Sequence, residues 1–319
     1  MKTLMIYGAT GYTGRMAAEH AKALGLDLVI AGRNEARLAS LAATLDVPYR
    51  VFAADAGQLE GIDVLLNFAG PFAHTAEPLM RACIASGTDY LDITAEINVY
   101  RLAERLGSGA QVMLLPGVGW DVVPSDCLAM HVARRVQQPH TLRLALQVPG
   151  AMSRGSAMSV SEILGAGVMA RINGELVATP DAALQSLDFG AGPVLCAPLS
   201  FGDLVTAWHS SAVPNIAMFV HITGEAFPEG DLSLLPDGPT QAQRDAHRAR
   251  AVAEVTGADG SVARSVIETV NGYSYTPLAA VEAARRVLAG ERRPGFQTPA
   301  KLFGVGFAQS IAGTRIIDY

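Results

Sequence analysis

Near its start the chain carries the stretch Thr3-Leu4-Met5-Ile6-Tyr7-Gly8-Ala9-Thr10-Gly11-Tyr12-Thr13-Gly14, an apolar run that ends in three glycines at every third position. A helical pattern of residues follows directly, so the glycines lie on a turn from strand to helix. Gly8 can adopt the backbone angles of a sharp turn, Gly11 lets a pyrophosphate approach the main chain, and Gly14 lets the helix pack closely on the strand. The phosphates would then bind N–H groups at the positive end of the helix.

A second apolar run, residues 28–31, lies one helix downstream and ends in Gly32-Arg33-Asn34. A fold specific for NAD usually places an acid there, on the ribose 2′-hydroxyl, and this chain has none. Arg33 carries a planar, permanent charge suited to a phosphate, and Asn34 adds a neutral donor. The cofactor is therefore expected to be NADP(H). The alternatives are a glycine turn that is only architecture and an Arg33 that is only a solvated residue after a strand.

Composition and charge exclude several classes of protein. Of 319 residues, 50% are hydrophobic and 17% are charged, which describes a well-buried globular protein of two lobes. The net charge of −6 argues against a nucleic-acid partner, because no basic stripe is available to neutralise phosphates. Any anionic ligand must be held locally.

The cysteines and the longest uncharged segment argue against further classes of protein. Cys83, Cys127 and Cys196 have no metal-type spacing, so neither a disulfide framework nor a metal site is expected. The first residues are expected to form a strand, so no signal peptide is expected. The window 204–224 reaches membrane-spanning length but contains Pro214, Asn215, His209 and two serines, so no membrane partner is expected and a cytoplasmic location fits best.

Strands and helices alternate over the first 120 residues. A helical pattern covers 36–45, an apolar run at 49–52 ends at Asp55, and a longer buried run covers 63–72. This alternation predicts an α/β fold with a doubly wound parallel sheet, a Rossmann fold. Ligands bind such sheets beyond the carboxyl ends of the strands, so the chemistry is expected at the strand tips.

Two strand tips look functional. The tip from Asn67 to Phe72 would lie beside the nicotinamide, where small residues and a proline let the backbone approach the ligand. The next strand, 90–94, carries Asp92 and is followed closely by Glu96. Buried carboxylates are usually neutralised, hydrogen-bonded or functional, so Asp92 has a structural alternative and Glu96 is the better candidate to face a substrate.

A further strand, 112–115, runs into a cluster of glycines and prolines at 116–126 that looks like the exit from the nucleotide domain. Ser125 or Asp126 is expected to cap the next helix. Cys127 would then lie in the first turn, where the helix dipole lowers a thiol pKa. A thiolate nucleophile is therefore a rival chemistry, although such a cysteine is more often a small buried residue.

From here the pattern changes to a second domain. Leu142, Leu144, Leu146 and Val148 alternate with Thr141, Arg143, Ala145 and Gln147. Ile216, Met218, Val220 and Ile222 alternate in the same way with Ala217, Phe219 and His221. This period predicts an α+β domain with a mostly antiparallel sheet. Helices are expected at 157–171 and 241–256, with a Pro/Gly-rich connection at 227–239. A strand at 262–273 and a helix that begins at Thr276-Pro277 follow. The apolar tail, 296–319, is expected to return to the nucleotide domain.

The expected domains are therefore 1–125 plus about 275–319 for the dinucleotide and 126–274 for the substrate. The residues expected to bind the cofactor lie at the glycine turn and at the strand tips. They are Gly8, Thr10, Gly11, Tyr12, Thr13, Gly14, Arg33, Asn34, Asp55, Phe68, Ala69, Gly70 and Pro71.

Several stretches together resemble the saccharopine dehydrogenase-like family of oxidoreductases, the broad group that includes trans-acting enoyl reductases. They are Gly8 to Gly14 with Gly32-Arg33-Asn34; Asn67 to Phe72 with Tyr90-Leu91-Asp92-Ile93-Thr94-Ala95-Glu96; Gly119-Trp120-Asp121 with Pro124-Ser125-Asp126; Phe201-Gly202-Asp203 with His209-Ser210 and Pro214-Asn215; and Gly272-Tyr273 through Gly295-Phe296-Gln297-Thr298-Pro299. Each stretch is modest alone, and their order makes the resemblance fairly specific.

The resemblance implies an NADP(H)-binding domain and a second α+β domain that closes over the nicotinamide. The chain departs from the family in its shorter second domain and in Ala95, where a glycine is common. Saccharopine carries three carboxylates and would need a cluster of basic groups, whereas the second domain offers scattered arginines such as Arg143, Arg154 and Arg171. Turnover of saccharopine is not expected.

The leading hypothesis is a reductase that moves a hydride between NADPH and a C=C, C=N or C=O bond of a small, mostly apolar substrate. Asp92, Glu96 and Asp121 are the expected proton donors or orienting groups. The Tyr-x-x-x-Lys pair of short-chain dehydrogenases is excluded, because no lysine stands four residues after a tyrosine. The second hypothesis is a non-catalytic NADP(H) sensor or scaffold. The exposed edges of the second sheet could support a homodimer.

Overall fold

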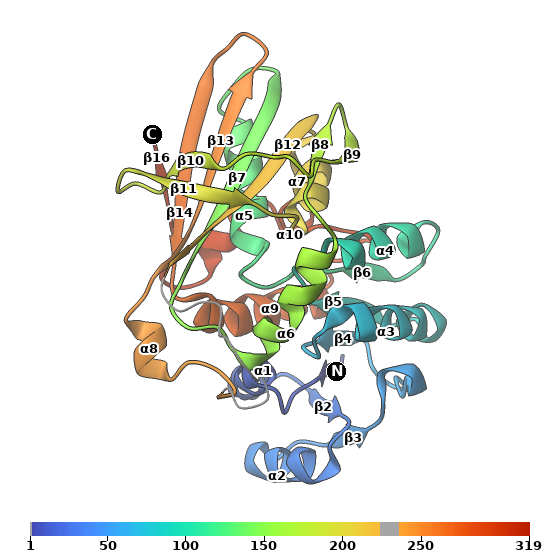
Figure 1. Ribbon diagram of the computed structural model, residues 1–319. Coiled ribbons are helices and arrows are strands. Elements are labelled where there is room, and N and C mark those ends of the chain that lie inside the picture. The colour runs from blue at the N-terminus through green and yellow to red at the C-terminus, as the bar shows by residue number, and fades with distance from the viewer. Residues whose placement is uncertain (1, 224–235) are drawn as a thin grey trace.

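The computed structural model describes residues 2–223 and 236–319, and a parallel sheet forms its first layer (Figure 1). Neighbouring strands of this sheet pair in the order β15-β6-β5-β4-β1-β2-β3, and every pair is parallel. The strands are β1 (Leu4–Tyr7), β2 (Leu28–Gly32), β3 (Tyr49–Val51), β4 (Val64–Asn67), β5 (Asp89–Asp92), β6 (Met113–Leu115) and β15 (Gly295–Phe296). The order confirms the predicted doubly wound sheet.

Helices connect these strands and cover the sheet. They are α1 (Tyr12–Ala23), α2 (Glu35–Leu45), α3 (Phe72–Ser86), α4 (Ile97–Gly107) and, from the far end of the chain, α9 (Gly272–Leu288). Every residue of β1, β2 and β4 is buried, as expected for a sheet covered on both faces. Helix α9 packs against α1 and thereby brings residues from the far end of the chain to the glycine turn.

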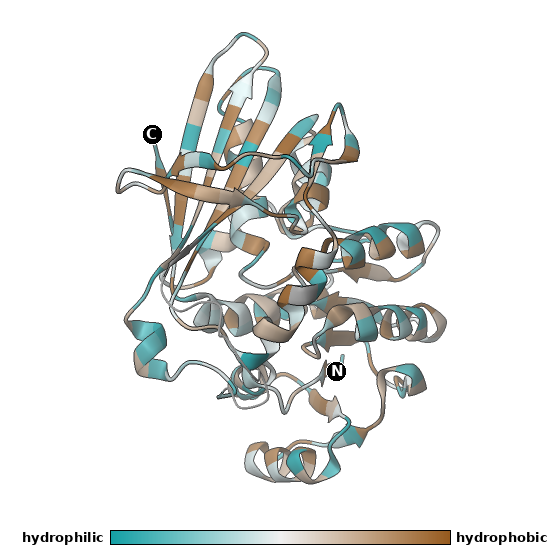
Figure 2. Cartoon of the chain, in the orientation of Figure 1, coloured by the Kyte–Doolittle hydropathy of each residue, from teal (hydrophilic) through white to brown (hydrophobic). Residues whose placement is uncertain are grey.

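A second, mixed sheet forms the other layer, with the main strand order β10-β11-β12-β7-β13-β14-β16. Its pairs are antiparallel except β12 with β7, which confirms the predicted mostly antiparallel sheet. The strands are β7 (Pro139–Pro149), β8 (Met169–Ile172), β9 (Glu175–Ala178), β10 (Gln185–Asp188), β11 (Pro193–Pro198), β12 (Asn215–Thr223), β13 (Ala249–Gly257), β14 (Val262–Thr269) and β16 (Arg315–Asp318). Figure 2 shows hydrophobic and hydrophilic residues alternating along its long strands.

Helices α5 (Val123–Ala133), α6 (Arg154–Gly165), α7 (Asp203–Ser211), α8 (Gln241–Asp245) and α10 (Pro299–Phe303) complete the fold. Helix α5 packs against β7, β13 and β14, and its residues are almost all buried. Helix α6 lies between the two sheets in the view of Figure 1. No helix among the described residues combines the length and apolarity needed to cross a membrane.

Three predicted elements were wrong at their boundaries. The helix expected at 241–256 is the short α8 followed by strand β13, because Ala249, Ala251, Ala253 and Val255 are buried in a sheet between two partner strands. The helix expected at 157–171 is α6, which begins at Arg154 and ends at Gly165, and strand β8 begins at Met169. The strand expected at 262–273 ends at Thr269, because the Asn271 side chain accepts a hydrogen bond from Tyr273 N and caps α9.

The tail differs from its prediction in part. Strand β15 joins the first sheet, as expected of the return to the nucleotide domain, but β16 pairs with β14 in the second sheet. The helix expected to be capped by Ser125 or Asp126 begins at Val123, so both residues lie within its first turn. Most of the connection expected at 227–239 lies outside the described residues. The domain boundaries stay a prediction.

Candidate functional site

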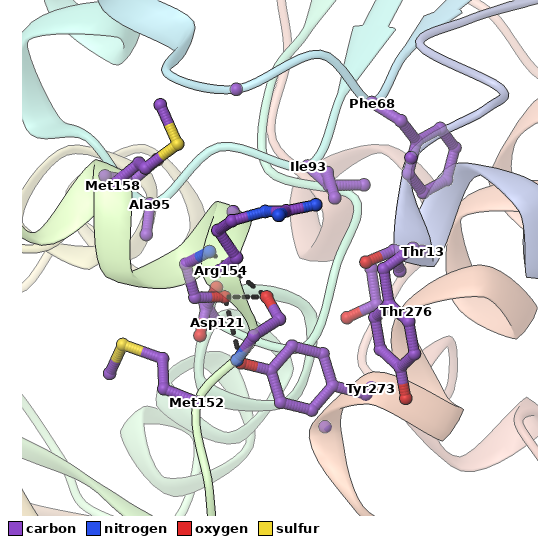
Figure 3. A pocket seen from close by; sticks show the side chains of 18 of the residues that line it. Thr13, Phe68, Ile93, Ala95, Asp121, Met152, Arg154, Met158, Tyr273 and Thr276 are labelled. Carbon is purple, nitrogen blue, oxygen red and sulfur yellow. Dashed lines mark hydrogen bonds between the residues drawn. The ribbon is translucent and has the colours of Figure 1, made fainter. Parts of the chain in front are cut away.

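A cavity of about 840 Å³ lies where the two sheets approach each other, within the range of ligand sites in proteins. Its walls come from the glycine turn, the tips of β2 and β4, the loop after β6, helix α6 and the start of α9. Figure 3 shows Phe68, Ile93 and Thr276 on one side of this space and Met152, Met158 and Arg154 on the other. The cavity is therefore shared by both sheets.

The glycine turn forms one end of the cavity, and its backbone leaves no room for side chains. Gly8 has a φ of +81°, and a Cβ there would lie 2.7 Å from the backbone nitrogen of Ala69. A Cβ on Gly14 would lie 2.3 Å from the carbonyl oxygen of Gly8. Gly11 is the N-cap of α1 and has no side chain to satisfy the N–H groups of the first turn, which leaves them for an anionic ligand.

The tip of β2 carries the basic groups expected for a 2′-phosphate. Arg33 and Asn34 line the cavity, and so does Arg37, which the sequence reasoning missed. The side chain of Asn34 caps α2 by accepting a 3.0 Å hydrogen bond from Arg37 N. Arg37 also donates to the carbonyl oxygen of Thr10 at 3.0 Å and so lies beside the glycine turn. Arg37 stands four residues after Arg33, in the first turn of α2, and this spacing could have identified it as a second basic residue near the phosphate.

An acid from the second half of the chain approaches these basic groups. The Asp237 carboxylate lies 3.8 Å from the Arg37 guanidinium and forms an ion pair with Arg154 of α6. Next to it, Tyr12 donates a hydrogen bond to the carbonyl oxygen of Pro239, and Arg244 donates to Tyr12 Oη at 2.6 Å. Residues 237–244 therefore cross the start of α1.

Most of the residues predicted to bind the cofactor surround this one cavity. Gly8, Thr10, Gly11, Tyr12, Thr13, Gly14, Arg33, Asn34, Phe68, Ala69 and Gly70 line it. Of the predicted catalytic residues, Glu96 and Asp121 line it as well. Asp55, Pro71 and Asp92 are not among the lining residues.

Asp92 is fully buried and organises the neighbouring loops. Its Oδ1 accepts hydrogen bonds from Thr94 N at 3.0 Å and Gly117 N at 2.9 Å, and its Oδ2 accepts one from Tyr90 Oη at 2.9 Å. Burial raises the pKa of Asp92 to about 6, although these hydrogen bonds favour the ionised form. Asp92 thus ties the end of β5 to the loop that leaves β6.

That loop carries Asp121 into the cavity. Trp120 fixes it from the other side, because its backbone N–H donates to Thr276 Oγ1 at 3.0 Å and its indole donates to Thr269 Oγ1 at 2.9 Å. Asp121 follows directly and is partly exposed to the cavity. Burial alone raises the pKa of Asp121 to about 6. A carboxyl group with this pKa can hold or release a proton near neutral pH.

Glu96 holds the start of α3. Its two carboxylate oxygens accept hydrogen bonds from Phe72 N at 2.8 Å and Ala73 N at 2.7 Å, in the first turn of that helix. Burial raises the pKa of Glu96, and these two bonds oppose the rise. A carboxylate at a helix N-terminus is a stabilising arrangement. Glu96 therefore positions the tip of β4, whereas Asp121 faces the cavity without such bonds.

The rival nucleophile Cys127 is fully buried in α5. Burial raises the pKa of its thiol far above the ordinary value, and the nearby Asp126 raises it further. The expected lowering by the helix dipole is therefore outweighed by desolvation. Cys127 behaves as a small packing residue.

Three hydroxyl groups in the cavity wall were also missed by the sequence reasoning. Ser153 and Ser156 belong to the start of α6, and Tyr273 belongs to the first turn of α9. Their oxygens are linked by hydrogen bonds, which Figure 3 marks with dashed lines. The Ser-x-x-Ser spacing at a helix start was a signal for a cap, but nothing in the sequence places Tyr273 against it.

Comparison with known proteins identifies the nucleotide-binding part. Residues 4–111 match the family model of the saccharopine dehydrogenase NADP binding domain. This confirms the resemblance predicted from the sequence and the choice of NADP as cofactor.

Two curated relatives share part of this chain. A trans-acting enoyl reductase from Mycobacterium leprae is 32% identical over 159 residues, which are 43% of this chain and 37% of that protein. A trans-acting enoyl reductase from Mycobacterium ulcerans is 29% identical over 160 residues, which are 44% of this chain and 38% of that protein. The chain thus spans less than half the length of these relatives.

A solved structure matches the whole fold. Apo saccharopine dehydrogenase (L-Glu forming) from Saccharomyces cerevisiae superposes with a TM-score of 0.66, and all of both chains is covered. The sequence identity is 13%, so this likeness concerns the fold alone. It agrees with a parallel nucleotide-binding sheet followed by a mixed sheet.

The close packing at Gly14 gives a direct test of the glycine turn. We expect Gly14→Ala to destabilise the protein by about 1–3 kcal/mol, because the new methyl group overlaps the Gly8 carbonyl, and to abolish NADPH binding. Urea unfolding and fluorescence titration with NADPH measure the two effects. Gly306→Ala is the control, since no atom lies within 4 Å of a Cβ there. Tight NADPH binding by a folded Gly14→Ala variant would contradict the assignment.

Proposed function

We propose that this protein is an NADP(H)-dependent oxidoreductase that transfers a hydride between NADPH and a C=C, C=N or C=O bond of a small, mostly apolar substrate. The observation that carries the proposal is the single cavity that joins the glycine turn and Arg33 to apolar side chains of the second sheet and α6. The names of the two relatives, both enoyl reductases, agree with this chemistry.

The residues present fit a dinucleotide. The turn from Gly8 to Gly14 has no space for a Cβ at Gly8 or Gly14, so the backbone is open to a close ligand. The first N–H groups of α1 have no side-chain cap and lie at this turn. Arg33 and Arg37 would hold the 2′-phosphate, and the tip of β4 at Phe68 to Gly70 would lie against the nicotinamide. When bound, the reduced nicotinamide supplies the hydride.

The other half of the cavity fits an apolar substrate. Its lining includes Met152, Met158, Ile163, Leu199 and Phe201, which come from α6 and from segments next to the second sheet. Such side chains exclude water from the reacting carbon and supply binding energy through buried apolar area. Asp121 lies in the same wall and is the proposed proton donor or orienting group. Asp92 and Glu96 are proposed to position it and the β4 tip.

A non-catalytic sensor is the alternative outcome of the test. Purified protein is incubated with NADPH and a panel of apolar enones, imines and aldehydes, and NADPH consumption is followed by absorbance. Oxidation of NADPH with at least one of these compounds supports the proposal. Tight binding of NADPH without oxidation by any of them would favour the sensor. The cytoplasmic location and the homodimer stay predictions from the sequence.

The cofactor preference should depend on Arg33. We expect the wild type to bind NADPH more tightly than NADH, and Arg33→Ala to remove about 1–3 kcal/mol of that preference, because a charged hydrogen-bonding pair is lost. Titration of both nucleotides measures the difference. Arg15→Ala is the control, since Arg15 is an exposed residue of α1 that pairs with Glu19. An unchanged preference in Arg33→Ala would place the 2′-phosphate elsewhere.

The pH dependence should report Asp121. As a proton donor Asp121 must be protonated, so we expect kcat for reduction to fall as the pH rises through about 6. We expect Asp121→Asn to lower kcat by about 10²–10⁴-fold and to abolish this pH dependence, while NADPH affinity changes little. Initial rates across about pH 5–8 check both expectations. A variant that keeps the wild-type profile would exclude Asp121 as the proton donor.

A further inference from the structure

The hydroxyl groups of Ser153, Ser156 and Tyr273 form one hydrogen-bonded cluster in the wall of the cavity. Tyr273 Oη donates to Ser156 Oγ at 3.0 Å, and Ser153 Oγ donates to the same Ser156 oxygen at 3.0 Å. The cluster joins the start of α6 to the start of α9. It therefore connects a helix that follows the second sheet to a helix that packs on the first.

Two backbone N–H groups anchor this cluster. Ser153 N donates to Tyr273 Oη at 2.7 Å, and Ser156 N donates to Ser153 Oγ at 3.1 Å. A backbone N–H can only donate, so one lone pair of Tyr273 Oη and one of Ser153 Oγ are occupied. The hydroxyl groups of Tyr273 and Ser153 both donate to Ser156 Oγ.

One hydroxyl proton of the cluster is not used in the hydrogen bonds within it. The three hydroxyl groups carry three protons, and two hydroxyl-to-hydroxyl bonds link them, so one proton is left for an acceptor outside the cluster. In the arrangement described, Ser156 Oγ accepts twice and its own proton is the free one. Ser156 is partly exposed and lines the cavity, so that proton is available to a ligand there.

The surroundings favour negative charge beside Ser156. Ser153 is the N-cap of α6, and Ser156 lies in the first turn of this twelve-residue helix, where the dipole is positive. Burial raises the pKa of Tyr273, so its phenol stays protonated and continues to donate to Ser156. An oxygen that already accepts two hydrogen bonds is also a stronger donor, because such chains polarise one another.

We propose that Ser156 donates its hydroxyl hydrogen to the oxygen or nitrogen of the substrate's polarised double bond, with Tyr273 and Ser153 as positioning residues. The inference rests on the proposed function and narrows its substrate class. The substrate must carry a carbonyl or imine group, either as the reacting bond or conjugated to a C=C bond. An isolated C=C bond has no atom for Ser156 to bind.

The chemical step balances with groups already named. Hydride from NADPH forms a new C–H bond at the carbon of the C=O or C=N group, or at the far carbon of a conjugated C=C bond. The π electrons move to the heteroatom, whose growing negative charge is stabilised by the hydrogen bond from Ser156. Asp121 then supplies the proton that completes the product and recovers one from water. Ser156 therefore keeps its own proton.

Kinetics of matched variants test this assignment. We expect Ser156→Ala to lower kcat for apolar enals and aldehydes by about 10²-fold, as for removal of one donor to a developing oxyanion, with NADPH affinity unchanged. The loss should be equal at every pH, since a serine hydroxyl does not titrate, which separates it from the effect of Asp121. We expect Ser156→Thr to restore activity to within about tenfold and Tyr273→Phe to cause a smaller loss than Ser156→Ala. Ser40→Ala, an exposed serine of α2, is the control.

A binding measurement decides the inference independently of turnover. Octanamide has a carbonyl acceptor and an apolar tail but no reducible bond under these conditions, and it is titrated into the protein saturated with NADP⁺. We expect Ser156→Ala to bind it about 3- to 10-fold more weakly than the wild type. Equal affinity, or an unchanged kcat in Ser156→Ala, overturns the role of Ser156 and leaves the proposed function intact. A wild type that reduces none of the panel refutes the proposed function, and the octanamide result still decides whether Ser156 is a donor.

Discussion

Three segments of backbone meet at Gly8, and the site depends on that contact. The left-handed conformation of Gly8 turns the chain out of β1, the first turn of α1 packs on its carbonyl oxygen at Gly14, and the tip of β4 approaches at Ala69. Each approach is closer than a Cβ would permit. The N-terminus of α1 and the tip of β4 are thereby placed on one side of a single cavity, where a phosphate and a nicotinamide can be held together.

The opposite wall is placed by buried polar groups rather than by the sheet alone. Asp92 ties the loop after β6 to the end of β5, and Trp120 ties the same loop to Thr269 and Thr276. Asp121 is therefore held between Asp92 of the first sheet and two threonines, one at the end of β14 and one in α9. Because Asp121 is desolvated and accepts none of these anchoring bonds, it can titrate near neutral pH while its neighbours act as supports.

Much of the nucleotide-binding half could be predicted because its signals are local. The glycine spacing, the apolar runs and the Arg33 position each follow from a few neighbouring residues, and the parallel sheet follows from their alternation. The second half was harder. Strand β13 begins with Ala249, Arg250 and Ala251, whose helix propensity is high, and only pairing with β7 and β14 makes them a strand.

The site residues also divide into those that local sequence predicts and those that only the folded chain brings together. The glycine turn from Gly8 to Gly14 was predicted from its spacing. Which of Asp92 and Asp121 accepts hydrogen bonds from backbone N–H groups depends on the folded chain, and a sequence does not show that. Arg37 was visible as a second arginine in a helical turn. The cluster of Ser153, Ser156 and Tyr273 joins residues about 120 positions apart, so only the folded chain brings it together.

The central claim is that one dinucleotide contacts walls built from both halves of the chain, and hydrogen exchange with and without NADPH tests it most directly. Slower amide exchange is expected on NADPH binding in residues 8–14 and 68–73, from the first sheet, and also in 271–276 at the start of α9. Slowing confined to 8–14, with 68–73 and 271–276 unchanged, would contradict a shared cavity, because the nucleotide would then lie on the first sheet without reaching the wall that carries Asp121 and Ser156.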